Sequence, residues 1–182
     1  MLKGIGASQG YGIGKAVVIK NESLDYSSVK YSDAENEKKR LHDAVEKYCS
    51  QTQALAENLR EIAPYTDFVT HTVKVTEENA EALLADAQII CEAFDKAECK
   101  AMLAEIVLDK MPEKYLVSGS GMAGLGPANA IKTRRITEHF YLCGDGVSDV
   151  DDGIGLVSAR VMLCAAHQAH TILRILAGMY EV

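Results

Sequence analysis

The feature that most constrains the fold is a short apolar run, residues 87–94, which ends in an acidic residue, Asp95. A helical pattern of apolar and polar residues follows at once and extends to about Met111, where Pro112 ends it. This pattern is typical of a buried parallel strand that leads directly into a helix. Because ligands of open α/β sheets bind at the carboxyl ends of the strands, Asp95 lies where a functional carboxylate is expected. The alternative is that Asp95, with Glu98 three residues later, only caps the helix.

Strand and helix patterns continue on the C-terminal side of this unit. Residues 115–119 and 140–145 are predicted as strands, and residues 131–136 as a further strand. The charges of that last strand are typical of a solvated sheet edge, and a position near phosphates is the alternative. The final helix is expected over 154–178, with Gly178 as its C′ residue. The alternation of strands and helices predicts an α/β fold, with a partial sheet and flanking helices.

The N-terminal part has a different pattern. Residues 2–7 and 14–20 are predicted to form a β-hairpin around a glycine-rich turn. Apolar residues at alternating steps of four and three predict a long helix over 33–62. Residues 68–75 then alternate like a strand, and Thr76 is expected to cap a short helix.

The glycines near the N-terminus match neither of two common phosphate-binding loops. A Walker loop fails because Gln9 stands where its first glycine belongs, and Ala16 where Ser or Thr belongs. The dinucleotide pattern G-x-G-x-x-G fails at the same Gln9. A second loop of small residues, 118–130, suits close approach to a ligand or to another backbone, or else forms a flexible crossover.

Composition excludes several classes of protein. The 182 residues are 48% hydrophobic and 25% charged, which is ordinary for a globular protein with one good core. The net charge of −7 and the pI of about 5.2 argue against nonspecific binding to nucleic acid or to an anionic membrane surface. The sequence starts without an apolar signal-peptide core, so a cytoplasmic location is expected.

Cysteines and histidines do not predict a disulfide framework or a metal site. The five cysteines are odd in number and include no C-x-x-C pair, so reduced thiols are expected. His167 and His170 share a helix face three residues apart, but no third ligand is evident.

The C-terminal two thirds contain five stretches with a recognisable pattern: ALAENLREIAPYT, KVTEENAEALLADAQIICEAFDKAECKAML, YLVSGSGMAGLG, IKTRRITEHFYLCGDG and GLVSARVMLCAAHQAHTILRILAG. On these stretches, from about Gln53 to Gly178, the chain resembles the ThiF family of adenylyltransferases, which activate the C-terminal glycine of a sulfur-carrier protein. The resemblance implies a Rossmann-like fold of the ThiF and MoeB type. It is to the bacterial subgroup that lacks zinc-binding C-x-x-C pairs.

This resemblance implies a site for ATP and magnesium. Asp95 matches the aspartate that holds magnesium and the adenylating phosphates, and Lys96 beside it is an implied ATP contact. Cys143 matches the cysteine that takes the activated carrier as a thioester or persulfide in several relatives; the alternative is a small buried hydrophobe. The family's glycine loop for ATP is absent, and its phosphate-contacting lysine falls on Gln51, so impaired activity is expected.

The first stretch of the chain, MLKGIGASQGYGIGKAVVIK, resembles a different family. Residues 1 to about 50 are similar to the extreme N-terminus of Enzyme I, the phosphoenolpyruvate-protein phosphotransferase. The similarity ends far upstream of that enzyme's phosphorylated histidine. The chain is therefore expected to combine two partial domains, 1–50 and 51–182, that join near Ser50 to Gln53.

Three functions follow from these patterns. The first is a ThiF-like adenylyltransferase that acts on a ThiS-like sulfur-carrier protein in thiamine biosynthesis, and the homodimers of the family imply that a second chain can complement the site. The second is a protein related to the sugar phosphotransferase system. The third is a non-catalytic interaction module, in which helices 33–62 and 154–178 pair with a partner.

Overall fold

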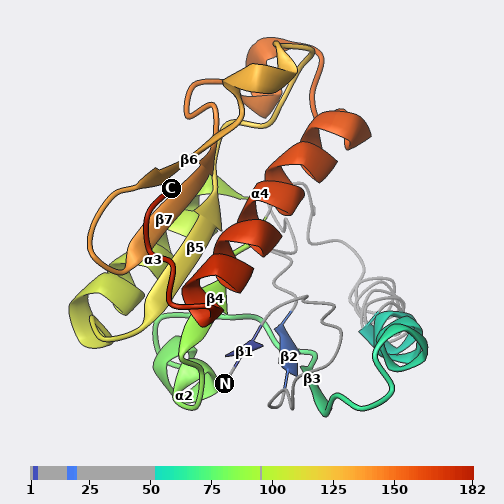
Figure 1. Cartoon of the computed structure of the whole chain (residues 1–182), viewed down its shortest axis with the longest axis vertical. Coiled ribbons are helices and arrows are strands. Elements are labelled where there is room, and N and C mark those ends of the chain that lie inside the picture. Colours follow the sequence, from blue (N-terminus) through green and yellow to red (C-terminus); the bar gives the residue numbers. More distant parts are fainter. Residues whose placement is uncertain (1, 4–15, 20–51, 95) are drawn as a thin grey trace, which may run out of the picture.

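The computed structural model describes residues 2–3, 16–19, 52–94 and 96–182, and its described part is built on a parallel sheet (Figure 1). The strand order of this five-stranded sheet is β1-β4-β5-β7-β6. Neighbouring strands are parallel except for β6, which lies antiparallel to β7 at the edge. The strands are β1 (Leu2–Lys3), β4 (Ile89–Cys91), β5 (Tyr115–Gly119), β7 (Phe140–Gly144) and β6 (Lys132–Arg135). The α/β fold predicted from the sequence is thus confirmed.

A second, two-stranded sheet pairs β2 (Ala16–Ile19) in parallel with β3 (Phe68–His71). The predicted hairpin of the first two strands is therefore wrong, because β1 and β2 belong to different sheets. Leu2 is aligned with Ile89 on β4, so β1 covers the edge of the main sheet beside β4. The hairpin was predicted from the glycine-rich turn between the two strands. A local turn signal of this kind cannot show that β1 pairs with β4 and β2 with β3, because those partners are distant in the chain.

Helices cover both faces of the main sheet. On one face lie α2 (Ala80–Leu84) and α3 (Ala97–Lys110), and on the other lies α4 (Ser158–Leu176) (Figure 1). Two short 3-10 helices connect these elements: Ala128–Ala130 lies between β5 and β6, and Val150–Asp152 lies between β7 and α4. Residues 52–62, the described part of the predicted long helix, are helical.

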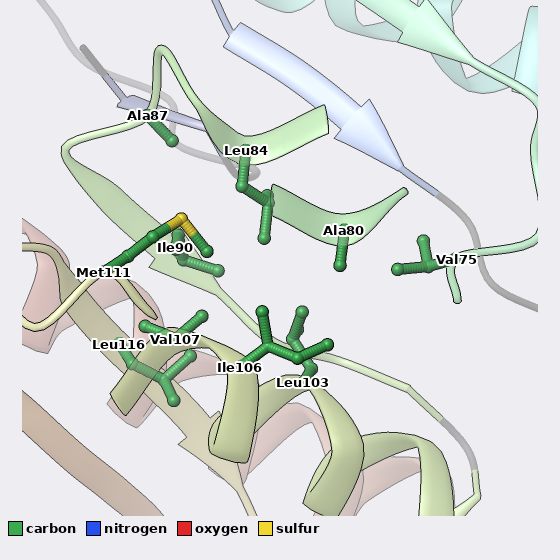
Figure 2. Packing of buried hydrophobic residues seen from close by; sticks show 10 residues of the cluster. All are labelled: Val75, Ala80, Leu84, Ala87, Ile90, Leu103, Ile106, Val107, Met111 and Leu116. Carbon is green, nitrogen blue, oxygen red and sulfur yellow. The ribbon is translucent and has the colours of Figure 1, made fainter. Parts of the chain in front are cut away.

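The apolar core consists of two clusters, one on each face, because neighbouring strand residues point in opposite directions. Ile90 and Leu116 pack with α2 and α3, whereas Ile89 and Val117 pack with α4. Figure 2 shows the first cluster, in which side chains of α3 meet those of α2 and the strands. Its members are Val75, Ala80, Leu84, Ala87, Ile90, Leu103, Ile106, Val107, Met111 and Leu116. Strands buried on both faces account for the continuous apolar run from which the fold was predicted.

The ends of the helices differ in how well local sequence predicted them. Gly178 (φ 73°) is the C′ residue of α4 as expected, and Met179 N–H donates to the Arg174 carbonyl at 2.8 Å. In contrast, Thr76 does not cap α2: the N-cap position is Asn79, whose side chain accepts from Thr76 N–H instead. The asparagine closes a turn ahead of the helix, so α2 begins later than predicted.

Within the described residues, no helix combines the length and the apolar character that crossing a membrane requires.

Candidate functional site

A pocket of about 270 Å³ lies at the carboxyl ends of β4 and β5, between the start of α3 and the first half of α4. We call it the strand-end pocket. Its wall includes Ala93 from the β4–α3 connection, Ala97 at the start of α3, Ser120 after β5, Ser148 after β7, and Ala165 of α4. This is the position at which open α/β sheets bind their ligands, and it is the position predicted from the sequence.

Two loops meet at one side of this pocket because glycines allow their backbones to touch. A Cβ atom on Gly144 (φ 135°) would lie 1.7 Å from the carbonyl oxygen of Ser120. A Cβ atom on Gly121 (φ 76°) would lie 2.3 Å from the backbone nitrogen of Gly146. The sequence left open whether loop 118–130 approaches a ligand, approaches another backbone or is a flexible crossover. At Gly121 the loop lies close to another backbone.

Glu92 is the most strongly held polar side chain at the strand-end pocket. It follows β4 directly and is only 1% exposed. Lys100 Nζ of α3 lies 2.9 Å from Glu92 Oε1, and the Ser118 hydroxyl donates to Oε2. The Phe94 backbone N–H also donates to Oε1. A buried carboxylate with one cation and several donors is well compensated, and here it ties β4, β5 and α3 together at the pocket.

A buried glutamine joins α4 to the same corner. Gln168 is 6% exposed, and its Nε2 donates to the Glu92 backbone carbonyl at 2.8 Å. Lys100, Glu92 and Gln168 all line the pocket. The ammonium of Lys100, on a side chain that is 20% exposed, is therefore a positive charge in the pocket wall whose position is fixed.

A second ion pair, between Asp145 and Arg160, lies next to the strand-end pocket. The two side chains line a smaller cavity of about 200 Å³ that shares Ala123, Ser148 and Asp149 with it. Burial alone would raise the pKa of Asp145. Hydrogen bonds from the amides of Ser148 and Val147, the Ser148 hydroxyl and the Arg160 guanidinium outweigh burial and lower that pKa to about 2. Asp145 is thus ionised at neutral pH.

The predicted site residues have different outcomes. Asp95 lies outside the described residues, between Phe94, which lines the strand-end pocket, and Lys96. Lys96 occupies the N-cap position of α3 without a side-chain cap hydrogen bond and is not among the residues that line the pocket. The capping alternative placed Asp95 at the N-cap position of α3, whereas the residue at that position is Lys96. The roles of Asp95 and Lys96 toward ATP remain predictions.

Cys143 lies at the end of β7 in the core between the sheet and α4. It is 0% exposed, and its Sγ lies 3.6 Å from Thr133 Oγ1. Burial raises the pKa of this thiol, an effect that hydrogen bonds with Thr133 and Thr171 partly offset. A protonated, enclosed thiol is a poor nucleophile. The thioester role remains a prediction, and the described geometry fits the alternative of a small buried hydrophobe.

Sequence reasoning missed Glu92, Lys100 and Gln168. The signal for Glu92 was present, because a charged residue inside the otherwise apolar run 87–94 requires a partner if it is buried. Its partner Lys100 lies eight residues away, beyond the three- or four-residue spacing of pairs within a helix. Only the tertiary structure identifies the pair.

Comparison with known proteins supports both resemblances. Residues 3–115 match a family described as PEP-utilising enzyme, N-terminal. Among curated proteins, the adenylyltransferase and sulfurtransferase UBA4 of Candida glabrata is 21% identical over 178 residues, covering 94% of this chain and 39% of UBA4. The chain therefore spans about two fifths of the length of this relative.

Solved structures with the same fold include those of the E. coli tRNA N6-threonylcarbamoyladenosine dehydratase TcdA. The complex of TcdA with AMP matches with a TM-score of 0.63 at 14% identity, over 93% of this chain and 79% of that one. The complex with ATP matches with a TM-score of 0.56 at 14% identity, over 91% and 78%. The Rossmann-like fold of the ThiF type is thereby confirmed.

Proposed function

The chain belongs to the family described as PEP-utilising enzyme, N-terminal, and from its fold and its similarity to UBA4 we propose a nucleotide-dependent transfer function centred on the strand-end pocket. In this proposal the chain is a ThiF-like adenylyltransferase of reduced activity. It binds ATP and acts on the C-terminal carboxylate of a sulfur-carrier protein, of the ThiS type used in thiamine biosynthesis.

The observation that supports this proposal most is the position of the strand-end pocket. It lies at the carboxyl ends of two adjacent parallel strands, and its wall contains the ammonium of Lys100, which the buried Glu92 holds in place. Lys100 Nζ contacts both carboxylate oxygens of Glu92 and so uses two of its three N–H donors, and the third can bond a phosphate oxygen. UBA4 is named as an adenylyltransferase, and TcdA has been solved with AMP and with ATP.

Magnesium fits this proposal as an ion held mainly by the nucleotide. The described residues contain no group of three or more histidine, cysteine or acidic side chains that could hold a metal ion. Magnesium at nucleotide sites is usually bound by one or two carboxylates together with phosphates, and it spreads the charge that develops at the reacting phosphorus. We assign the protein carboxylate to Asp95. Glu92 is less suited, because Lys100, Ser118 and the Phe94 amide already occupy its oxygens.

Titration calorimetry with Mg-ATP tests this proposal. We expect binding by the wild-type chain and a loss of at least about tenfold in affinity for Asp95→Asn, because one charge-assisted contact contributes about 1.4 kcal/mol or more. The matched control is Asp109→Asn, an exposed aspartate near the end of α3, which should bind like wild type. Absence of binding at millimolar nucleotide would overturn the proposal. If binding is present, pyrophosphate exchange with a carrier protein is the next assay.

A second candidate function rests on the family match over residues 3–115. A phosphotransferase-related protein would accept a phosphoryl group from phosphoenolpyruvate on a histidine. Incubation with labelled phosphoenolpyruvate, followed by acid-labile phosphate analysis, distinguishes this function from adenylylation. Label on a histidine without affinity for Mg-ATP would favour the second candidate over the first.

A further inference from the structure

A larger pocket lies on the α4 side of the main sheet. It has a volume of about 470 Å³ and is bounded by β6, β7, α4 and the segment 179–182. We call it the edge pocket, because β6 is the edge strand. It shares no lining residue with the strand-end pocket. Its volume lies within the range of about 300–1,000 Å³ that is usual for small-molecule sites.

Positive charge is concentrated in the wall of the edge pocket. Lys132 and Arg174 both line it, although the chain as a whole carries a net charge of −7. The carboxylate among its lining residues is that of Glu181, which is 92% exposed and lies 3.8 Å from Arg135, a residue outside the pocket wall. The side chains of the pocket wall therefore include two cations and one carboxylate.

Hydroxyl and imidazole groups are fixed in the same wall. Thr133 Oγ1 of β6 lies 3.0 Å from His167 Nδ1 and 3.4 Å from Thr171 Oγ1 of α4. The Thr171 hydroxyl donates to the His167 carbonyl at 2.7 Å. These contacts hold the His167 ring by Nδ1, and among the described residues no hydrogen bond occupies Nε2.

Helical spacing brings the remaining polar groups to this side of α4. His167, His170, Thr171 and Arg174 recur at steps of three and four and all line the pocket. Arg174 already binds an acceptor here, because its Nε and Nη2 donate to the Glu181 carbonyl at 3.2 and 2.8 Å. Two of the five guanidinium N–H donors are thus in use, and an oxyanion would have to bond the others.

From this combination of volume, charge and fixed donors we propose that the edge pocket binds the oxyanion group of a small ligand, a phosphate or a carboxylate. Lys132 and Arg174 supply the positive charge, and Thr133, His167 and His170 supply directed hydrogen bonds. The proposal does not depend on nucleotide binding at the strand-end pocket.

Amide NMR spectra of the ¹⁵N-labelled full chain, titrated with inorganic phosphate and separately with succinate, test this proposal. We expect saturable shifts at Thr133 and His167 with at least one of the two ions, and the ion that binds more tightly identifies the group recognised. Lys132→Gln and His170→Gln change exposed side chains and should each weaken binding about tenfold, as expected for the loss of one charge-assisted contact. Lys74→Gln, an exposed lysine elsewhere, should leave binding unchanged.

Three results would overturn the proposal: no saturable shift with either ion, shifts centred on Ser120 and Ser148 of the strand-end pocket, or equal weakening by Lys74→Gln. Saturating AMP should leave phosphate binding at the edge pocket intact. If Mg-ATP does not bind at all, the nucleotide proposal fails while the edge pocket is still tested by the phosphate and succinate titrations.

Discussion

Lys100 on α3 places its ammonium 2.9 Å from the carboxylate of Glu92, a residue that is 1% exposed and directly follows β4. The pair joins a strand end to the helix that follows it, on either side of the segment that contains Asp95. The same carboxylate accepts hydrogen bonds from Ser118 and from the Phe94 amide. The local structure around the proposed nucleotide site therefore depends on this one buried charge.

Lys100→Met should destabilise the fold by about 3 kcal/mol, because it leaves the Glu92 carboxylate buried without its cation. Urea unfolding at neutral pH measures the loss. The double variant Glu92→Gln with Lys100→Met should lose less than the sum of the two single variants, since the two residues are coupled. If Lys100→Met changes stability by less than about 0.5 kcal/mol, as an ordinary surface substitution does, the pair is not the anchor that we describe.

Lys114 should contribute to stability by holding the end of α2 against the start of β4. Its Nζ lies 3.1 Å from the Leu84 carbonyl and 2.8 Å from the Ala87 carbonyl, and it also contacts the Ala85 carbonyl. Lys114→Met removes these contacts and should cost about 2 kcal/mol in the free energy of unfolding, the range of hydrogen bonds to a charged group. The comparison is Lys74→Met, an exposed lysine, for which denaturation curves should overlay those of wild type.

Stability should depend on the ionisation of Asp145 at acid pH. Its folded-state pKa of about 2 lies below its ordinary value of 3.8, so the carboxylate stabilises the fold above about pH 4. This contribution is lost as the pH falls toward 2. Asp145→Asn should therefore be less stable than wild type at pH 7, and the difference should narrow between about pH 4 and pH 2 in thermal unfolding. A difference that stays constant over this range would contradict the assignment.

Cys143 should resist alkylation in the folded chain. Burial raises its pKa, and burial likewise raises the pKa of the neighbouring Cys164 to about 11. Iodoacetamide should therefore modify neither residue at pH 8 until urea unfolds the protein, as judged by peptide mass spectrometry. Modification of Cys143 in the native state, especially with nucleotide and carrier present, would instead favour its predicted role as the thioester nucleophile.

Local sequence patterns predicted the C-terminal half well because its elements are long or sharply bounded. The strand 115–119 has the bounds of β5, and Gly178 ends α4 through the left-handed conformation that glycine allows. The charges of 131–136 indicated an edge strand, and β6 lies at the edge. These features are determined by residues that are close together in the sequence, so they can be predicted from the sequence alone.

The rest depends on contacts between distant residues. Which strand pairs with β1 or β2 follows from packing of the whole chain, and the local glycine signal favoured the wrong partner. The strand-end rule located the strand-end pocket, but it could not identify Gln168, which lies 76 residues from the Glu92 carbonyl that it binds. Sequence reasoning therefore predicted the location of the candidate site and missed most of the side chains in its wall.

The most direct test of the central proposal is to locate nucleotide binding by amide NMR of the ¹⁵N-labelled chain titrated with Mg-ATP. If Mg-ATP binds in the strand-end pocket, the amide signals of Ala93, Ser120 and Ser148 should shift saturably in the wild-type chain. The same signals should not shift in the Asp95→Asn variant. No shift at millimolar nucleotide, or shifts confined to Thr133 and His167 of the edge pocket, would contradict a nucleotide site at the strand ends.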